Sequence, residues 1–220
     1  TAVGKDALIA NTTGSHNVAV GSQALDANTT GNYNYALGKD ALGSNTTGSV
    51  NVAIANALTS NTTGESNIAI GSNSLGDNTT GDANTAVGRQ ALGDNTTADN
   101  NTAVGYNALF KNTTGTQNTA LGANSGKAQT TADNCTWIGN DAGLVNTASN
   151  NTGVGAGTLR ANTTGTRNTA LGCGIYGATH GPLGSNTTGT RNTALGVLTL
   201  RSNTTASNNT AVGAEALADN

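Results

Sequence analysis

The sequence has few of the residues from which a globular core is usually built. Charged residues make up 10% of the 220 positions and aromatic residues 3%, and the chain holds one proline and no methionine. An ordinary globular domain carries roughly 25% charged residues, so a conventional compact domain is disfavoured. Disorder usually accompanies a high net charge, whereas the formal charge here is −3. That balance also lacks the basic face on which nucleic-acid binding depends.

Long apolar runs and cysteine motifs are missing as well. No apolar run approaches the roughly 18 residues that a membrane-spanning helix needs, so we expect no membrane insertion in this segment. Cys135 and Cys173 have no metal-binding spacing and are too few for a disulfide framework, and we interpret them as two incidental buried thiols. What the chain does hold is Asn, Thr and Gly, which number 33, 39 and 31 and make up 103 of its residues. This composition indicates a repeat protein or a fibre.

A short motif recurs along the whole chain. The tetrad Asn-Thr-Thr-Gly, or a near variant, begins at positions 11, 28, 45, 61, 78, 95, 112, 129, 146, 162, 186 and 203. Successive tetrads therefore start 16 or 17 residues apart, except for one spacing of 24 residues. We predict a single repeat array over residues 1–220. Because the sequence opens and stops inside a repeat, we expect a segment of a longer fibre.

Each repeat is too short for a helical hairpin, which needs more than about 30 residues. Residues 84–88 (Asn-Thr-Ala-Val-Gly) alternate with period two, as a half-buried strand does, and Ala91-Leu92 predicts a second short strand. Gly and Asn suit the corners because they tolerate left-handed backbone. We therefore predict an all-β parallel β-solenoid, or β-roll, of about 12 coils with about 17 residues each.

Stacked coils turn each repeat position into a column of side chains about 4.8 Å apart. One position always holds Leu or a β-branched residue and is predicted to line the interior: Val20, Leu37, Ile54, Ile70, Val87, Val104, Leu121 and Ile138. The predicted second strand supplies another apolar column: Leu25, Leu42, Leu58, Leu75, Leu92 and Leu109. The tetrad Asn residues, such as Asn28 and Asn45, predict a ladder of amides bonded along the stacking direction.

An alanine occupies the opposite face of the strand in most repeats. Because so thin a coil buries little surface alone, we interpret this column as the interface with other subunits of a homotrimer. The alternative is an exposed row kept small by a tight corner. The residues concerned are Ala19, Ala36, Ala53, Ala69, Ala86, Ala103 and Ala120.

Two strings in the sequence carry a family resemblance. Residues 66–71 (Ser-Asn-Ile-Ala-Ile-Gly) and 100–105 (Asn-Asn-Thr-Ala-Val-Gly) resemble the N-S-V-A-I-G core of YadA-type trimeric autotransporter adhesin heads. The longer string N-T-A-V-G-x-x-A-L-x-x-N-T-T-G is similar to repeat arrays of phage tail fibres. The resemblance implies a left-handed β-roll, three chains around one axis, and an extracellular place on a virion tail or cell surface. The coils here are longer than those of the adhesin heads.

Residue patterns for catalysis are absent. His16 and His180 lie in unrelated repeats, and no Ser-His-Asp or Cys-His arrangement recurs. We therefore expect no enzyme activity, no cofactor and no metal site. The tetrads also match the Asn-x-Thr glycosylation motif, but an amide ladder explains them without a glycan.

Two irregular places hold candidate partner contacts. Residues 173–184 form a predicted inserted loop with Tyr176 and His180. Insertions in solenoids often lie on the binding face, and the alternative is a neutral bulge. Trp137 replaces a column alanine, either as a sugar-stacking platform or as a gap-filler between subunits.

These features predict a structural or adhesive fibre segment, a trimeric tail-fibre or surface-adhesin shaft or head that presents host-binding surfaces. Its partners are expected to be copies of itself and a host-surface glycan or protein. One alternative is the subunit of a self-assembling extracellular filament, which needs the same coil. Another is a Thr-rich ice-binding solenoid. Against it, the two Thr of each tetrad are adjacent and would face opposite sides of a strand.

Overall fold

A computed structural model describes residues 1–174 and 181–219 of the chain. The chain divides into two compact units, Thr1–Asn107 and Ala108–Asn220. Each coil contributes one short strand. The strands of unit 1 are β1 (Ala2–Val3), β2 (Val18–Val20), β3 (Tyr35–Leu37), β4 (Val52–Ile54), β5 (Ile68–Ile70), β6 (Thr85–Val87) and β7 (Thr102–Val104). Those of unit 2 are β8 (Thr119–Leu121), β9 (Thr136–Ile138), β10 (Thr152–Val154), β11 (Thr169–Leu171), β12 (Thr193–Leu195) and β13 (Thr210–Val212).

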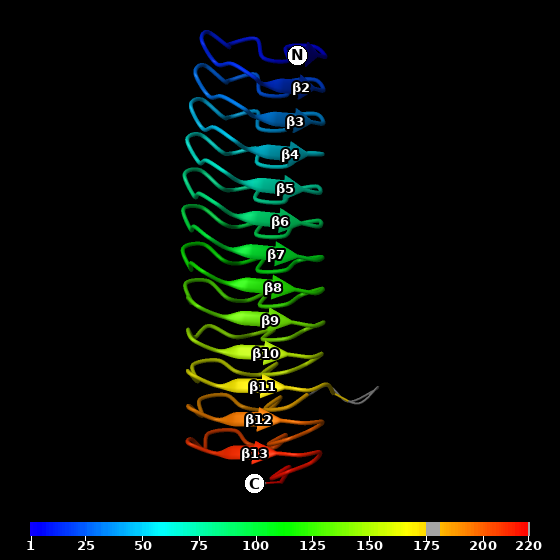
Figure 1. The fold of residues 1–220 in the computed structure, drawn as a ribbon, viewed down its shortest axis with the longest axis vertical. Helices are drawn as coiled ribbons and strands as arrows, with labels where there is room; N and C mark the ends of the chain where they lie inside the picture. Colours follow the sequence, from blue (N-terminus) through cyan, green and yellow to red (C-terminus); the bar gives the residue numbers. More distant parts are fainter. Residues whose placement is uncertain (175–180, 220) are drawn as a thin grey trace. The chain divides into compact units, whose positions relative to one another are not determined.

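Within each unit the strands pair in parallel and in chain order (Figure 1). The register is unbroken: Ala36 lies opposite Ala53 in unit 1, and Ala170 lies opposite Ala194 in unit 2. Every repeat position therefore forms a column. The predicted all-β parallel β-solenoid of about 12 turns with coils of about 17 residues is confirmed.

The strand face that lines the interior is the alanine face, so the predicted inside and outside are reversed. Ala36, Ala86 and Ala120 are at most 1% exposed, whereas Leu37 is 51% exposed. The column predicted to be internal is half-buried or exposed throughout: Val20, Leu37, Ile54, Ile70, Val87, Val104, Leu121 and Ile138. The column predicted to be a subunit interface lies inside its own chain: Ala19, Ala36, Ala53, Ala69, Ala86, Ala103 and Ala120.

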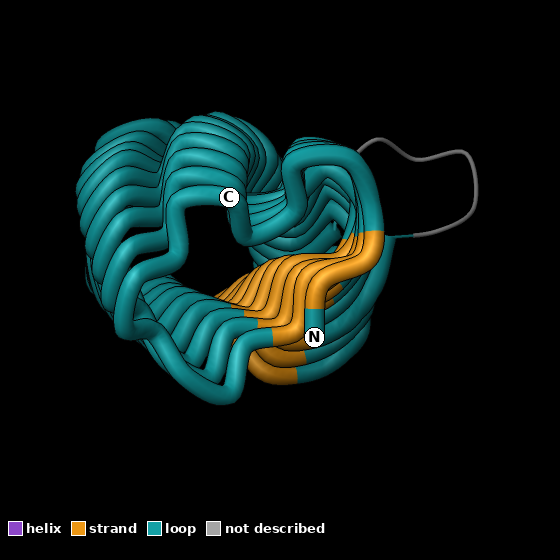
Figure 2. The backbone as a smooth tube through the Cα atoms, turned by 90° about the horizontal axis from the view of Figure 1, so that it is seen from above, coloured by secondary structure: helices purple, strands orange, loops and turns teal. Residues whose placement is uncertain are grey.

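The leucine column supplies the bulk of the interior. Leu25, Leu42, Leu58, Leu75, Leu92 and Leu109 are all fully buried, as predicted. They do not form a second strand, however: Leu25 and Leu92 lie in turns with φ angles of 52° and 50°. In each unit, the strands lie over one another along one side of the coil while loops form the remainder (Figure 2). We attribute the small size of the inward-facing strand residue, usually Ala, to this arrangement. Leu side chains from the turn occupy the thin space behind the strand, so only a methyl group fits there.

The tetrad asparagines form the predicted amide ladder. Asn45 Nδ2 donates to Asn28 Oδ1 at 2.9 Å, and Asn61 Nδ2 donates to Asn45 Oδ1 at 2.8 Å. Each of these amides also donates to the carbonyl three residues on, as Asn45 does to Gly48 at 3.0 Å. Asn28, Asn45 and Asn61 are all buried. The hydrogen bonds therefore satisfy polar groups whose removal from water would otherwise be costly.

A second asparagine ladder precedes the strands. Asn34 Oδ1 accepts from the backbone nitrogen of Asn51 at 3.0 Å, and its Nδ2 donates to the carbonyl oxygen of Gly48 at 2.8 Å. Asn67 repeats the arrangement further along the array, with Nδ2 donating to Gly81 O at 2.8 Å. Each of these side chains therefore joins two coils at the point where the chain enters the strand.

Candidate functional site

The outward face of the sheet is the main apolar surface of each unit. It has two columns, which we call the first and second outward columns. In unit 1 the first outward column holds Val18, Tyr35, Val52, Ile68, Thr85 and Thr102, and the second holds Val20, Leu37, Ile54, Ile70, Val87 and Val104. Tyr35 and Leu37, on the same strand, are 48% and 51% exposed.

Unit 2 presents the same two columns with a simpler composition. Its first outward column is Thr throughout, and its second is aliphatic throughout. The pairs from β8 to β13 are Thr119 with Leu121, Thr136 with Ile138, Thr152 with Val154, Thr169 with Leu171, Thr193 with Leu195, and Thr210 with Val212. Leu121, Leu171 and Leu195 are each more than two-fifths exposed.

No outward position of strands β2–β13 carries a charge. Contiguous exposed apolar surface on a soluble protein usually marks a site of association. Apart from the Thr residues and Tyr35, the side chains of the two columns are aliphatic, and such a surface suits packing against another apolar surface.

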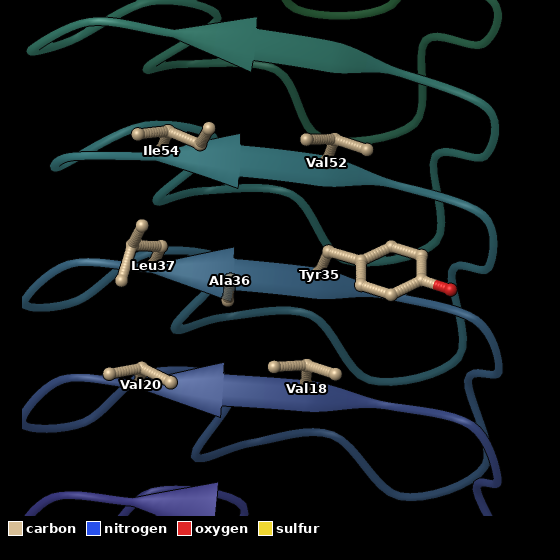
Figure 3. A pocket seen from close by; sticks show the side chains of 7 residues that line it. All are labelled: Val18, Val20, Tyr35, Ala36, Leu37, Val52 and Ile54. Atoms are coloured by element: carbon tan, nitrogen blue, oxygen red, sulfur yellow. The ribbon is translucent and has the colours of Figure 1, made fainter. Parts of the chain in front are cut away.

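A shallow groove lies on this face in unit 1. It has a volume of about 260 Å³ and is lined almost wholly by apolar atoms. Figure 3 shows Val20, Leu37 and Ile54 one above another at the ends of their strands, with Val18, Tyr35 and Val52 at the starts. The groove is therefore the space between successive side chains of the two columns.

Trp137 is not a surface platform, because the structure buries it completely. Its indole Nε1 donates to Gln129 Oε1 at 2.9 Å. Glycines replace the usual residues around the ring. Gly126 and Gly143 stand where most coils have Leu, and a Cβ on Gly126 would lie 2.7 Å from the indole Cδ1. The sequence carried a signal of this fit, since the glycines flank the one Trp in the chain.

The other candidate contacts, Tyr176 and His180, lie outside the described residues. Cys173, at the start of the predicted inserted loop, is exposed, so the expectation that both thiols are buried is wrong for this residue. Leu183, near the end of the same loop, is buried. The single repeat array over residues 1–220, with an inserted loop at residues 173–184, stays a prediction.

The two Thr of most tetrads have different surroundings. Thr29 is half-buried, and its Oγ1 donates to Thr46 O at 3.0 Å. Thr62 makes the same bond to Thr79 O at 3.0 Å. The second Thr of the tetrad, such as Thr30 or Thr63, is exposed. The first Thr row therefore binds coil to coil and is not a free row of hydroxyls.

Cys135 takes the place of an asparagine in the second ladder. Its backbone nitrogen donates to Asn118 Oδ1 at 2.9 Å, and its Sγ donates to Ala148 O at 3.3 Å. Burial raises the pKa of the Cys135 thiol to about 11. A high thiol pKa makes a poor nucleophile at neutral pH, so this residue has a structural role.

The described part of the chain bears on two further kinds of site, a cluster of metal ligands and a membrane-spanning helix. Within residues 1–174 and 181–219, no group of three His, Cys, Asp or Glu side chains could hold a metal ion. No helix in those ranges is long and apolar enough to cross a membrane.

No protein-family model matches the chain, and no curated protein or solved structure is significantly similar to it. The resemblance to adhesin heads and tail-fibre arrays therefore stays a prediction from the repeat motif. The outward face of the sheet is the surface from which a function can be inferred.

Proposed function

We propose that the chain is a structural segment of an extracellular fibre, a tail fibre or surface adhesin, in which copies pack together through the outward face of the sheet. The supporting observation is the second outward column, where an exposed or half-buried Leu, Ile or Val recurs in every coil and no charge interrupts it. Three copies are the number that the sequence resemblance implies.

A second copy of the chain matches this surface better than an unrelated partner does. The columns repeat at the spacing of paired strands, about 4.8 Å. A partner with a different axial repeat would lose register with the columns after a few coils. A parallel copy has the same repeat and places aliphatic side chains against aliphatic side chains along its whole length.

The length of the array is suited to such an interface. Fully burying an aliphatic side chain contributes about 1.5–3 kcal/mol, so burying the exposed half of one per coil contributes about 1 kcal/mol. Association costs an estimated 4–15 kcal/mol in lost freedom of motion. One or two coils cannot offset that cost, whereas the six or seven coils of one unit reach the lower part of that range. A long uninterrupted column is therefore what a stable fibre of this kind requires.

The interior suits a mechanical role. Two asparagine ladders and the bonds from the first Thr of the tetrad, such as Thr29, connect successive coils over most of each unit, in addition to the backbone bonds of the sheet. Bending or unstacking one coil breaks several buried hydrogen bonds together. We expect a stiff spacer whose exposed corners are available for host contacts.

The native mass of the chain in solution tests this proposal. Light scattering after size-exclusion chromatography is expected to give three times the chain mass, unchanged on dilution. Leu37→Glu with Leu121→Glu places charge in the second outward column and is expected to yield folded monomers. The matched control, Thr30→Glu with Thr114→Glu, adds the same charge at exposed tetrad positions and should leave the mass unchanged.

A parent chain that is monomeric would overturn the proposal. Monomers with strong thermal hysteresis would favour the ice-binding alternative. A mass that grows without limit as concentration rises would favour the filament. Circular dichroism on every variant separates loss of assembly from loss of folding.

A further inference from the structure

One corner of unit 2 repeats without change in two neighbouring coils. Residues 162–172 and 186–196 share the sequence N-T-T-G-T-R-N-T-A-L-G. The 24-residue spacing does not disturb their alignment, since Thr169 pairs with Thr193 and the Arg191 nitrogen donates to Thr166 O at 3.0 Å. Arg167 and Arg191, with φ angles of 56° and 54°, therefore occupy the same corner position one coil apart.

Among the residues that the structure describes, the two guanidinium groups have no carboxylate partner. Both arginines are exposed, and among the described residues the ion pairs involve Lys5, Lys39, Arg160 and Arg201 instead. Like charges at the same position of two neighbouring coils repel one another. Local arrangements that do not favour stability are expected at functional sites.

The acidic corner of unit 1 provides an instructive contrast. Glu65, Asp82 and Asp99 also occupy successive coils, but the two Asp carboxylates serve the fold. Asp82 Oδ1 accepts from the Glu65 nitrogen at 2.7 Å, and Asp99 Oδ1 accepts from the Asp82 nitrogen at 2.7 Å. The arginine side chains make no comparable hydrogen bond in the described chain, so their donors face solvent.

We propose that the Arg167–Arg191 corner binds an acidic polysaccharide, one that carries carboxylate or sulfate groups. This proposal specifies the ligand for the adhesive role proposed above and rests on it. Guanidinium groups bind carboxylate and sulfate oxygens through paired, charge-assisted hydrogen bonds. Thr164 and Thr188, three residues before the arginines in the chain, are exposed and can offer hydroxyls to sugar hydroxyls.

A polysaccharide fits this corner better than a nucleic acid does. Single-stranded nucleic acids need aromatic side chains for base stacking, and residues 162–172 and 186–196 contain none. Duplex binding needs an extended basic face, whereas two arginines cover only two coils. A chain with one anion per sugar presents charges at intervals that successive coils can meet.

A third segment of the chain shows which residue can replace arginine at this corner. Residues 112–122 read N-T-T-G-T-Q-N-T-A-L-G and differ from the two arginine segments only at Gln117. Gln117 has the same left-handed backbone, with φ of 59°. Arg167→Gln with Arg191→Gln is therefore expected to fold as the parent does.

The test measures affinity for heparin and for polysialic acid, with uncharged dextran and duplex DNA as competitors. We expect the double variant to lose about tenfold or more in affinity, as charge-assisted hydrogen bonds contribute. The second variant, Arg167→Gln with Gln117→Arg, keeps the net charge and composition but separates the arginines. It should lose affinity to the same extent as the double variant.

Equal binding by the charge-preserving variant and the parent would overturn the proposal, because net charge alone would then be responsible. Tighter binding of DNA than of either polysaccharide would also overturn it and favour a nucleic-acid ligand. Native mass is measured on the same samples. A trimer that fails to bind contradicts only this inference, whereas a monomer contradicts the proposed fibre.

Discussion

Trp137 and Gln129 form a hydrogen-bonded pair inside the coil, with the indole Nε1 donating to the side-chain Oε1 at 2.9 Å. Each replaces a smaller residue of the repeat, Ala and Asn respectively. Gln129 keeps the local bond of a tetrad Asn, because its Nε2 donates to Ala132 O at 2.9 Å. Its Oε1, the atom that would accept from the next coil in the ladder, accepts from the buried indole instead.

This pair predicts that restoring the usual residue nearby destabilises the chain. Gly126→Leu introduces the leucine of other coils into space that the indole and Leu109 occupy. Overpacking a core typically costs about 1–3 kcal/mol, so we expect a free energy of unfolding lower by that amount. Denaturant titration followed by fluorescence measures it, because Trp137 is the one Trp of the chain.

A compensated variant provides the control for that prediction. Trp137→Ala with Gly126→Leu and Gly143→Leu rebuilds the usual core and should recover most of the stability lost in Trp137→Ala alone, as measured by circular dichroism. If Gly126→Leu by itself were as stable as the parent, the packing described around Trp137 would be wrong.

The amide ladder predicts that substitutions at two nearby positions of one tetrad differ greatly in their effect on stability. Asn61→Ala removes the bonds to Asn45 Oδ1 and Gly64 O and leaves Asn78 without its acceptor. We expect a loss of about 1–3 kcal/mol, the cost of unsatisfied buried polar groups. Urea unfolding measures the change.

Two further substitutions test the cause of that loss. Thr63→Ala, on the exposed side of the same tetrad, should change stability by less than about 0.5 kcal/mol. Asn61→Asp keeps the shape but its carboxylate cannot donate, and it should destabilise the chain at neutral pH. Parent-like stability of the Asn61→Asp variant would argue against an amide ladder.

The two cysteines are expected to differ in reactivity. Cys173 is exposed, whereas Cys135 is buried and its pKa is raised from an ordinary 9.0 to about 11. At pH 8 a thiol reagent should modify Cys173 rapidly and Cys135 only on unfolding. Two equally fast thiols would contradict the burial of Cys135.

The raised pKa also predicts a loss of stability in alkali. The folded chain holds the Cys135 proton more tightly than the unfolded chain does, so this contribution is complete below pH 9 and is lost as pH rises from 9 to about 11. Cys135→Asn restores the ladder residue of other coils and removes the titrating group. Unfolding curves of this variant should depend less on pH across that window.

Local sequence patterns predicted much of the fold. The spacing of the tetrads located the coils, and the alternation around Thr85 and Val87 located the strand. The buried leucine column and the tetrad amide ladder followed from their recurrence, because a side chain repeated at one position of a stacked coil must meet its own copies.

Tertiary structure decided which strand face lies inside and what the leucines do. Alternation with period two distinguishes the two faces of a strand but does not show which face is buried. The usual preference for large side chains in the interior favoured the wrong face. Leu25 and its equivalents, in left-handed turns, fill the space behind the strand and leave room for a methyl group there. The aliphatic column is therefore outside, and Trp137 can be inside only where glycines replace leucine. The thickness of the coil, which no local sequence pattern shows, decides both which strand face is buried and where Trp137 fits inside.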